Sequence, residues 1–256
     1  MASEAKRAGL SFVRFAAIDG NELPVELRAQ FFSDTGQPHE PALTPGEIGC
    51  YASHLSIHEL LLSDKNNDYA LVLEDDVRLS PDLLATIDAI LAVLPKWDII
   101  RLSNATKSVA LPVASLPNGR EIARYWTVPN GAGAYLISRS GAEKSLKLRG
   151  GRTLPIDEDL RRPWRSGLDT YGVLPPPVEP DVFGMSRIAS MGRPDGVPAR
   201  RRFKGAAHRL DRFAVWTYRL KLFGPTAFLR ALIRSPIVST VKRTLGPVAA
   251  ERFFRL

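Results

Sequence analysis

Apolar and polar residues along the chain form short apolar runs that alternate with longer segments of helical spacing. Runs typical of strands, each next to turn-forming residues, lie at 10–18, 69–73, 98–102, 122–128, 134–137 and 172–174. The run at 122–128 is expected to be an edge strand. Helical spacing predicts helices at 23–32, 44–63, 80–94 and 140–148, with a short helix from Pro155. Strands that alternate with helices predict an α/β domain with a parallel or mixed sheet.

Two helix starts are marked by the local sequence. Thr44 can cap the helix at 44–63, Pro45 suits its first position, and Glu47 completes a capping box. In the same way, Ser80 is the expected cap of the next helix, with Pro81 at its first position.

Cys50 and His54 lie at positions i and i+4 of the helix at 44–63, hence on one face. Such a pair is either half of a metal site or a packed cysteine beside a hydrogen-bonded histidine. The sequence favours the second interpretation, because no further Cys/His pair accompanies them.

Three consecutive carboxylates, Glu74-Asp75-Asp76, follow the apolar run at 69–73. The run reads as a strand buried on both faces, and open α/β sheets place ligands at the carboxyl ends of such strands. Three adjacent acids repel one another unless a cation or water lies among them. The stretch is therefore either a divalent metal site that contacts phosphate oxygens or a solvated junction between strand and loop.

Small residues precede the strand at 134–137. Gly131 and Gly133 allow either close approach of a ligand or a tight turn into the strand. The stretch is not a dinucleotide-binding fingerprint, because the third glycine and the following helix are missing.

Composition indicates the kind of cellular compartment and shows that charge is unevenly distributed along the chain. A single cysteine excludes an intrachain disulfide and favours a reducing compartment, and no signal-peptide core or run of 18 apolar residues is present. From Arg187 onward there are 16 Lys and Arg against 3 Asp and Glu, whereas residues 1–186 have 19 against 24. The basic character of the chain, net +8, therefore lies in its tail.

The basic tail is expected to contact an anionic surface. Beyond a linker at 192–205, residues 210, 213, 217 and 220 share a helical face flanked by cations, and residues 226–233 form a second such segment. Aromatic residues among the cations, Phe213, Trp216, Phe223 and Phe228, favour anionic membrane over nucleic acid, for which no motif is present. A solvated basic helix is the remaining alternative.

Four motifs, in order, resemble glycosyltransferase family 25, the group of lipopolysaccharide β-galactosyltransferases and collagen galactosyltransferases. They are Leu-Thr-Pro-Gly-Glu-Ile-Gly-Cys at 43–50 with Ser53 and His54, Leu-Val-Leu-Glu-Asp-Asp-Val at 71–77, Gly-Ala-Tyr-Leu-Ile-Ser at 133–138 with Gly141 and Ala142, and Pro-Ile-Asp at 155–157. The resemblance covers about residues 8–188. It implies a GT-A-like domain at 1–188, followed by a basic linker and helical tail at 189–256.

The resemblance also implies an activity and its partners. It implies an inverting transfer of a hexose, usually galactose from UDP-galactose, to lipopolysaccharide or another saccharide or lipid-linked glycan of a bacterial surface. Mn²⁺ or Mg²⁺ would neutralise the departing diphosphate. The expected location is the cytoplasm, peripherally on the inner face of the cell membrane, with no nucleic-acid partner.

The resemblance assigns the carboxylates. Glu74 and Asp76 are the expected metal ligands, because alternate strand residues share a face. Asp75 and Asp76 are expected to bind the donor. Asp157, with Glu158 close behind it, is the candidate general base for the acceptor hydroxyl, its alternative role being a helix N-cap.

Gly131, Gly133 and His54 complete the expected donor site. Family members usually open with a further apolar strand and a basic helix that cradle the nucleotide base, and this chain begins inside that helix. The alternative function is therefore a truncated, weakly active or inactive relative that acts as a binding protein. A metal-dependent nucleotidyltransferase fits less well, because no glycine-rich or basic phosphate loop lies near the start.

Overall fold

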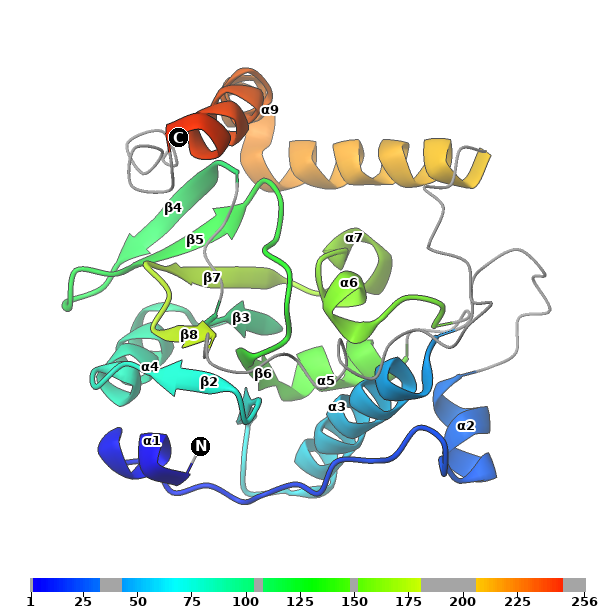
Figure 1. Cartoon of the computed structure of the whole chain (residues 1–256). Coiled ribbons are helices and arrows are strands. Elements are labelled where there is room, and N and C mark those ends of the chain that lie inside the picture. Colours follow the sequence, from blue (N-terminus) through cyan, green and yellow to red (C-terminus); the bar gives the residue numbers. More distant parts are fainter. Residues whose placement is uncertain (1, 33–42, 104–107, 148–151, 181–205, 246–256) are drawn as a thin grey trace.

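The computed structural model describes residues 2–32, 43–103, 108–147, 152–180 and 206–245. Its centre is a six-stranded mixed sheet in the order β1-β6-β3-β7-β5-β4 (Figure 1). These strands are β1 (Tyr69–Leu73), β6 (Ala134–Ser138), β3 (Ile99–Arg101), β7 (Thr170–Leu174), β5 (Glu121–Tyr125) and β4 (Ala110–Ser115). Neighbours β3 and β7 are parallel, and the other neighbouring strands are antiparallel. The predicted mixed α/β class is therefore confirmed.

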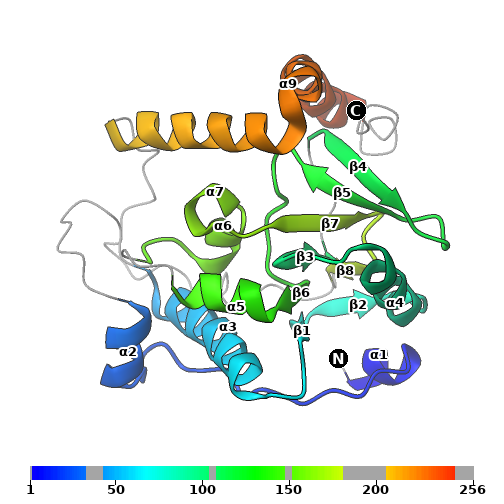
Figure 2. The same cartoon turned by 180° about the vertical axis from the view of Figure 1, so that it is seen from behind.

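Helices cover both faces of this sheet (Figures 1 and 2). Helix α4 (Leu83–Val93) lies on one face, beside a two-stranded sheet of β2 (Val77–Leu79) and β8 (Val178–Pro180). The other face carries α3 (Pro45–Ser63), α5 (Arg139–Leu146) and α6 (Ile156–Leu160). The remaining helices are α1 (Ala2–Arg7), α2 (Val25–Phe31), α7 (Pro163–Ser166) and α9 (Ala206–Leu245).

Strand alternation divides the apolar side chains between two cores. Ile100 and Leu136 are fully buried in the core beneath α4, whereas their chain neighbours Ile99 and Ile137 are fully buried beneath α3. Because both faces of these central strands are covered, the runs at 98–102 and 134–137 are apolar throughout rather than alternating.

The predicted capping box at the start of α3 is confirmed. The Thr44 hydroxyl accepts a hydrogen bond from the Glu47 backbone N–H, and the Glu47 carboxylate accepts one from the Thr44 N–H. Close by, the chain passes tightly against this helix, since a Cβ at Gly49 would lie 2.3 Å from the Ile18 carbonyl oxygen. Glycine at position 49 therefore allows the contact that holds residue 18 on α3.

The strand predicted at 10–18 is wrong. These residues run extended but are in no strand ladder, and the Phe12 and Val13 side chains are 49% and 95% exposed. Hydrogen bonds from Leu10 N to Ala5 O and from Ile18 N to Ser53 Oγ hold the two ends. Strand propensity reflects fit to a partly buried pleated surface, and no described strand offers that surface here.

Three finer expectations also need correction. Strand β1 is not buried on both faces: it forms one end of the sheet, its only described strand partner is β6, and Tyr69 is 38% exposed. The run at 122–128 is not an edge strand, because β5 pairs with both β4 and β7. Helix α4 starts later than expected, with Asp82 rather than Ser80 as its N-cap.

Helix α9 follows the predicted linker, which lies at 192–205 and therefore outside the described residues. It consists of two arms that meet at Gly224, whose φ of 70° and ψ of 166° are not helical. The following residue, Pro225, has no backbone N–H to continue the helical ladder. None of the helices that the structure describes combines the length and apolar character needed to cross a bilayer.

Candidate active site

The carboxylate cluster begins where β1 ends, on the face of the sheet that α3 covers. Val72 packs in the core beneath α3, and Glu74, two residues further on, directs its carboxylate toward His54 of that helix. Asp75 and Asp76 are exposed and form the turn from β1 into β2. The alternation of side chains along the strand thus delivers Glu74 to the α3 side.

His54 is held from both sides. Its Nε2 lies 3.5 Å from Glu74 Oε1, and its Nδ1 is 2.8 Å from the Tyr135 hydroxyl oxygen. The same hydroxyl is 2.9 Å from Nε2 of His58, whose Nδ1 lies 3.1 Å from Ser145 Oγ. This buried network fixes the orientation of the His54 ring and directs one ring nitrogen toward the carboxylate.

Cys50 joins the cluster one helical turn before His54. Ligand atoms of Cys50, His54 and Glu74 all lie within 4.8 Å of one another. Burial, followed by the negative charges of Glu74, Asp157 and Asp76, raises the pKa of the Cys50 thiol to about 12. The sequence favoured a packed cysteine beside a hydrogen-bonded histidine and named Glu74 as a metal ligand separately; it did not predict that these three residues come together.

The loop at 130–133 lies against these acids. The Glu74 backbone N–H donates to the Gly133 carbonyl at 2.8 Å. A Cβ at position 133 would lie 3.2 Å from Val77 Cγ1 and 3.9 Å from Glu74 Oε2. Glycine therefore leaves space beside the carboxylate, and Gly131 adopts a positive φ of 90° that glycine accommodates without strain.

The acids at the start of α6 differ in their surroundings. Burial raises the pKa of the Asp157 carboxyl, which also accepts a hydrogen bond from the Glu158 N–H at 2.9 Å. Asp157 is not the helix N-cap, because Pro155 takes that place. Glu158 pairs with Arg161 at 2.9 Å. Of the two predicted catalytic acids, Asp157 lies nearer the cluster, since its charge acts on Cys50.

Arg101 lies beneath the site and was missed by sequence reasoning. Its side chain is fully buried at the end of β3, where one guanidinium nitrogen donates to the Gly131 carbonyl. The Nε and Nη1 atoms have no hydrogen-bond partner in the described structure. Burial lowers the pKa of Arg101, while the nearby charges of Asp157 and Glu74 act in the opposite direction. Arg101 thus partly offsets the acids and holds the glycine loop.

The buried His58 makes stability depend on pH. Burial lowers its pKa from 6.5 to about 3, so below pH 6.5 the unfolded chain takes up a proton that the folded chain does not. Stability should therefore fall as the pH drops from 6.5 toward 3, by about 2 kcal/mol between pH 7.5 and pH 5. Urea unfolding at both pH values measures this loss. His58→Gln should remove most of the difference, and an identical pH dependence in the variant would contradict the assignment.

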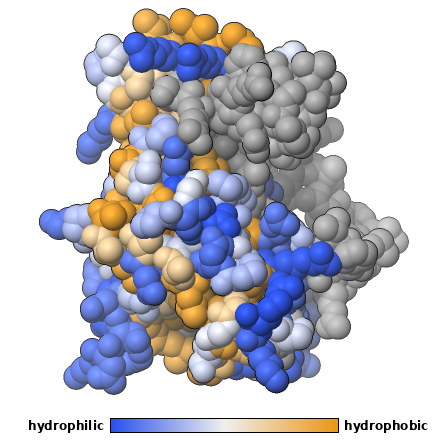
Figure 3. Space-filling view, turned by 90° about the vertical axis from the view of Figure 1, so that its left-hand side faces the viewer, coloured by the Kyte–Doolittle hydropathy of each residue, from blue (hydrophilic) through white to orange (hydrophobic). Residues whose placement is uncertain are grey.

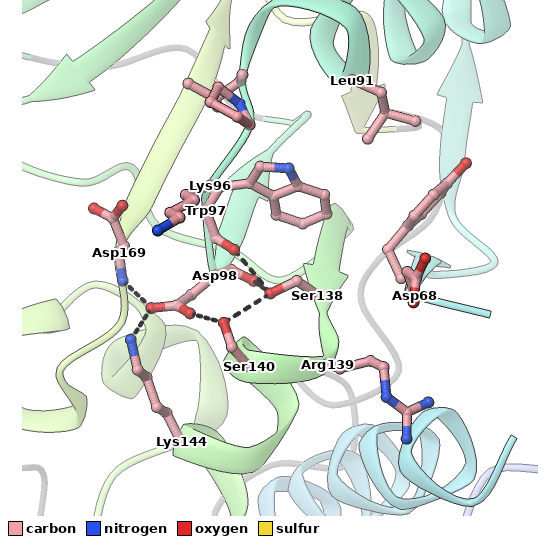
Figure 4. A pocket seen from close by; sticks show the side chains of 13 residues that line it. Asp68, Leu91, Lys96, Trp97, Asp98, Ser138, Arg139, Ser140, Lys144 and Asp169 are labelled. Atoms are coloured by element: carbon pink, nitrogen blue, oxygen red, sulfur yellow. Dashed lines mark hydrogen bonds and ion pairs between the residues drawn. The ribbon is translucent and has the colours of Figure 1, made fainter. Parts of the chain in front are cut away.

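An open cavity of about 760 Å³ lies at the opposite end of β1, beside Asp68 and Tyr69 (Figure 4). Its central carboxylate, Asp98, accepts hydrogen bonds from Lys144, Ser140 and the Asp169 backbone N–H. These groups hold α5 and the start of β7 in place. The acids Glu74, Asp75 and Asp76 follow the other end of the strand, so this cavity is separate from the candidate active site.

The structure thus brings together most of the residues that the sequence singled out. The negative charges of Glu74, Asp76 and Asp157 all raise the pKa of Cys50. Arg101 donates a hydrogen bond to the Gly131 carbonyl; burial lowers its pKa, and the charges of Asp157 and Glu74 raise it. No strong sequence signal marked Arg101, because a charged residue at the end of an apolar run usually lies in solvent. Tyr135 was equally hidden, within a run of strand formers.

Comparisons with known proteins show the family of this chain. A sequence model of glycosyltransferase family 25, described as an LPS biosynthesis protein, matches residues 1–159. Procollagen galactosyltransferase 1-B of Xenopus laevis is 34% identical over 131 residues, which is 48% of this chain and 20% of that protein. Human procollagen galactosyltransferase 2 is 33% identical over 127 residues, 46% of this chain and 19% of that protein.

An insect protein that this chain is similar to is also named for glycosyltransferase family 25. A glycosyltransferase 25 family member of Anopheles gambiae is 31% identical over 166 residues, covering 59% of this chain and 27% of that protein. The matches therefore span between about a fifth and about a quarter of these relatives' lengths.

Proposed function

Because this chain belongs to glycosyltransferase family 25, we propose that it transfers a hexose from a nucleotide sugar to a saccharide acceptor, with inversion at the sugar carbon. UDP-galactose is the first donor to test, because the relatives include proteins named galactosyltransferases. The observation that carries the proposal is that Glu74 lies against the glycine loop and that the negative charges of Glu74, Asp157 and Asp76 all raise the pKa of the same thiol, Cys50. A GT-A-like arrangement of the domain is part of the proposal and agrees with the mixed sheet flanked by helices.

The donor set fits a divalent cation. The negative charges of three acids raise the pKa of one partly buried thiol, and ligand atoms of Glu74, His54 and Cys50 lie within 4.8 Å of one another. We assign Glu74 and Asp76 as the residues that would hold Mn²⁺ or Mg²⁺, since hard cations prefer carboxylate oxygens. When bound, such an ion would neutralise the charge that develops on the departing diphosphate.

Residues of the chain orient the donor around this point. Asp75, which is exposed, would accept hydrogen bonds from donor hydroxyls. Gly131 and Gly133 leave room for the donor beside Glu74, and Arg101 fixes the position of their loop through the Gly131 carbonyl. The His54 ring, held by Tyr135, fixes the Glu74 carboxylate from the other side.

Asp157 is the proposed general base. An inverting transfer requires a group that accepts the proton of the acceptor hydroxyl, opposite the departing phosphate. Burial raises the pKa of Asp157, which makes the carboxylate a stronger base, while Arg101 and a hydrogen bond from Asn130 favour its ionised form. Glu158 is the weaker candidate, because Arg161 occupies its carboxylate.

A substitution at Cys50 tests whether carboxylates alone hold the ion or whether Cys50 is one of its ligands. At neutral pH its thiol is protonated, with a pKa of about 12, and a protonated thiol is a poor ligand. If carboxylates hold Mn²⁺ or Mg²⁺, Cys50→Ser should change kcat by less than about threefold. The measurement is transfer rate against the concentrations of Mn²⁺, Mg²⁺ and Zn²⁺. A large loss in the variant, together with a preference for Zn²⁺ in the wild type, would instead assign the ion to Cys50, His54 and Glu74.

The proposed function is tested by donor turnover. The protein is incubated with Mn²⁺ and one UDP-sugar at a time, and release of UDP is followed with and without saccharide acceptors. We expect UDP-galactose or UDP-glucose to support transfer or slow hydrolysis. Acceptors are compared in two sets, lipopolysaccharide core sugars and hydroxylysine peptides, which separate a bacterial glycan from a collagen-like acceptor. A lack of turnover with every donor, alone and with both acceptor sets, would contradict the proposal.

The second candidate function is a non-catalytic, saccharide- or membrane-binding relative. It is favoured by the end position of β1, whose only described strand partner is β6, and by the exposed segment at 10–18. In this candidate function, the edge of β1 that no described strand covers does not hold a nucleotide base. This candidate predicts no measurable affinity for UDP or UDP-sugars, so a titration of UDP into the protein separates the two functions.

A further inference from the structure

Both arms of α9 lie on the same side of the molecule, over β4, β5 and α7 (Figures 1 and 2). The first arm runs from Ala206 to the kink at Gly224, and the second from there to Leu245. Side chains of residues 211–237 and 240 are described. Each arm therefore has a face toward the body and an opposite face that points away from it.

The inward face of the first arm is held by specific contacts. Tyr218 lies 6.2 Å from Trp164, ring centroid to ring centroid, and the Trp164 Nε1–H donates to Asp211 at 2.8 Å. Arg219 stacks over Trp126 and donates to the Trp126 carbonyl at 2.8 Å. These contacts direct Asp211 and Arg219 inward.

The kink and the second arm also pack against Trp126. Phe223 and Phe228 lie 5.6 Å and 5.3 Å from its ring centroid, and Ala231 is fully buried in the same cluster. Ser235 Oγ is 2.7 Å from Ser108 Oγ. Two of the three phenylalanines predicted to face a membrane therefore pack against the body instead, Phe223 buried and Phe228 partly buried.

The outward faces carry a stripe of exposed apolar side chains. Six of the fourteen exposed large apolar residues in the described structure lie on α9, although α9 contributes only a small part of the chain: Phe213, Trp216, Leu220, Leu229, Ile233 and Ile237. Their spacings of three and four residues place them on one face of each arm. In Figure 3, an apolar band runs along the top of the molecule, where α9 lies, with hydrophilic side chains directly beneath it.

The exposed charges beside this stripe are all positive. Arg212, Lys221, Arg230 and Arg234 are exposed, whereas Asp211, the acidic residue among the described side chains of α9, faces Trp164. An apolar stripe flanked by cations complements a bilayer interface that carries anionic headgroups. A nucleic acid would use the cations but would leave the aliphatic side chains exposed to water.

We propose that the outward faces of the two arms of α9 bind the surface of an anionic lipid bilayer. The six apolar side chains lie in the interface, and the cations contact lipid phosphates and carboxylates. The kink at Gly224 extends the contact in two directions instead of one. Such binding would hold the carboxylate cluster above a membrane where a lipid-linked glycan is presented. It does not require transfer activity, so its failure would leave the proposed reaction untouched.

The experiment is sedimentation of the full chain with vesicles of phosphatidylcholine, with and without phosphatidylserine, at physiological ionic strength. We expect binding to the vesicles that contain phosphatidylserine. The variant with Phe213→Ser, Leu229→Ser and Ile233→Ser should bind them at least tenfold more weakly. All three side chains are more than half exposed, so folding should be unaffected, as a melting curve verifies.

A matched control replaces three exposed apolar residues elsewhere, Val25, Leu60 and Val93, by serine and should bind as the wild type does.

A charge variant, with Arg212, Lys221 and Arg230 each changed to Gln, should lose about fivefold in binding for each cation removed. Three outcomes would overturn the proposal: no binding of the wild type to either vesicle, equal loss in the control variant, or undiminished binding of the apolar variant. Binding of the apolar variant to single-stranded RNA with wild-type affinity, combined with no vesicle binding by the wild type, would assign the surface to nucleic acid.

Discussion

Replacing Asp76 with asparagine is expected to lower kcat for hexosyl transfer by at least about a hundredfold, because neutralisation of the departing diphosphate contributes several kcal/mol to the transition state. Asp76 is exposed in the turn after β1, so the substitution should leave the melting temperature nearly unchanged. The measurement is steady-state transfer at increasing Mn²⁺. Excess Mn²⁺ should restore part of the lost rate, as expected when a cation ligand is weakened.

The matched control for this variant is Asp68→Asn, which removes an exposed carboxylate just before the other end of β1. It should retain full activity at every Mn²⁺ concentration. Equal rates in Asp76→Asn and Asp68→Asn would show that the acids after β1 have no role in transfer.

The second large effect is expected from Asp157→Asn, which should lower kcat by roughly 10²- to 10⁴-fold, the usual contribution of a general base. Unlike the change at Asp76, it should leave the affinity for the donor and the Mn²⁺ requirement intact, because Asp157 is assigned to the acceptor side. The measurement is kcat together with the KM for UDP-galactose. Glu158→Gln is the control, with a much smaller loss expected since Arg161 already holds that carboxylate.

A different result would reassign the base. If Glu158→Gln abolishes turnover while Asp157→Asn retains it, the ion pair with Arg161 must open in the working enzyme. If both variants retain the wild-type rate, the base lies elsewhere.

Local sequence signals predicted the features that local physics determines. The capping box at Thr44 and Glu47 needs only neighbouring residues, and the structure has it as expected. Central strands β3 and β6 were recognisable because burial on both faces requires continuous apolar runs. The apolar run at 69–73 also predicted a strand that ends just before Glu74, although β1 is not buried on both faces.

The sequence-based predictions were wrong where the structure of a segment depends on residues far away in the sequence. Residues 10–18 have the composition of a strand, but a strand also needs a neighbour, which composition does not supply. On α9, cations and aromatics could be counted from the sequence, yet which aromatic residues face outward depends on Trp126, which lies 97 residues before Phe223. Phe223 and Phe228 therefore pack against Trp126, whereas Leu229 and Ile233 are exposed.

In the candidate active site, too, local features could be predicted from the sequence and contacts between distant residues could not. The sequence identified the acids one by one, while their common neighbours, Cys50 and Arg101, came from other elements of the fold. Arg101 is the clearest case, because a fully buried guanidinium with unpaired N–H groups is unfavourable unless nearby acids compensate for it. Only the folded arrangement shows that Glu74 and Asp157 are those acids.

In the proposed function, the carboxylates after β1 hold a nucleotide sugar with the help of a divalent cation. The most direct measurement is isothermal titration of UDP-galactose into the wild type and Asp76→Asn, each with and without Mn²⁺. We predict saturable binding by the wild type that requires Mn²⁺ and is strongly weakened in the variant. Absence of binding by the wild type in the presence of Mn²⁺, or equal binding by both proteins without it, would contradict the claim.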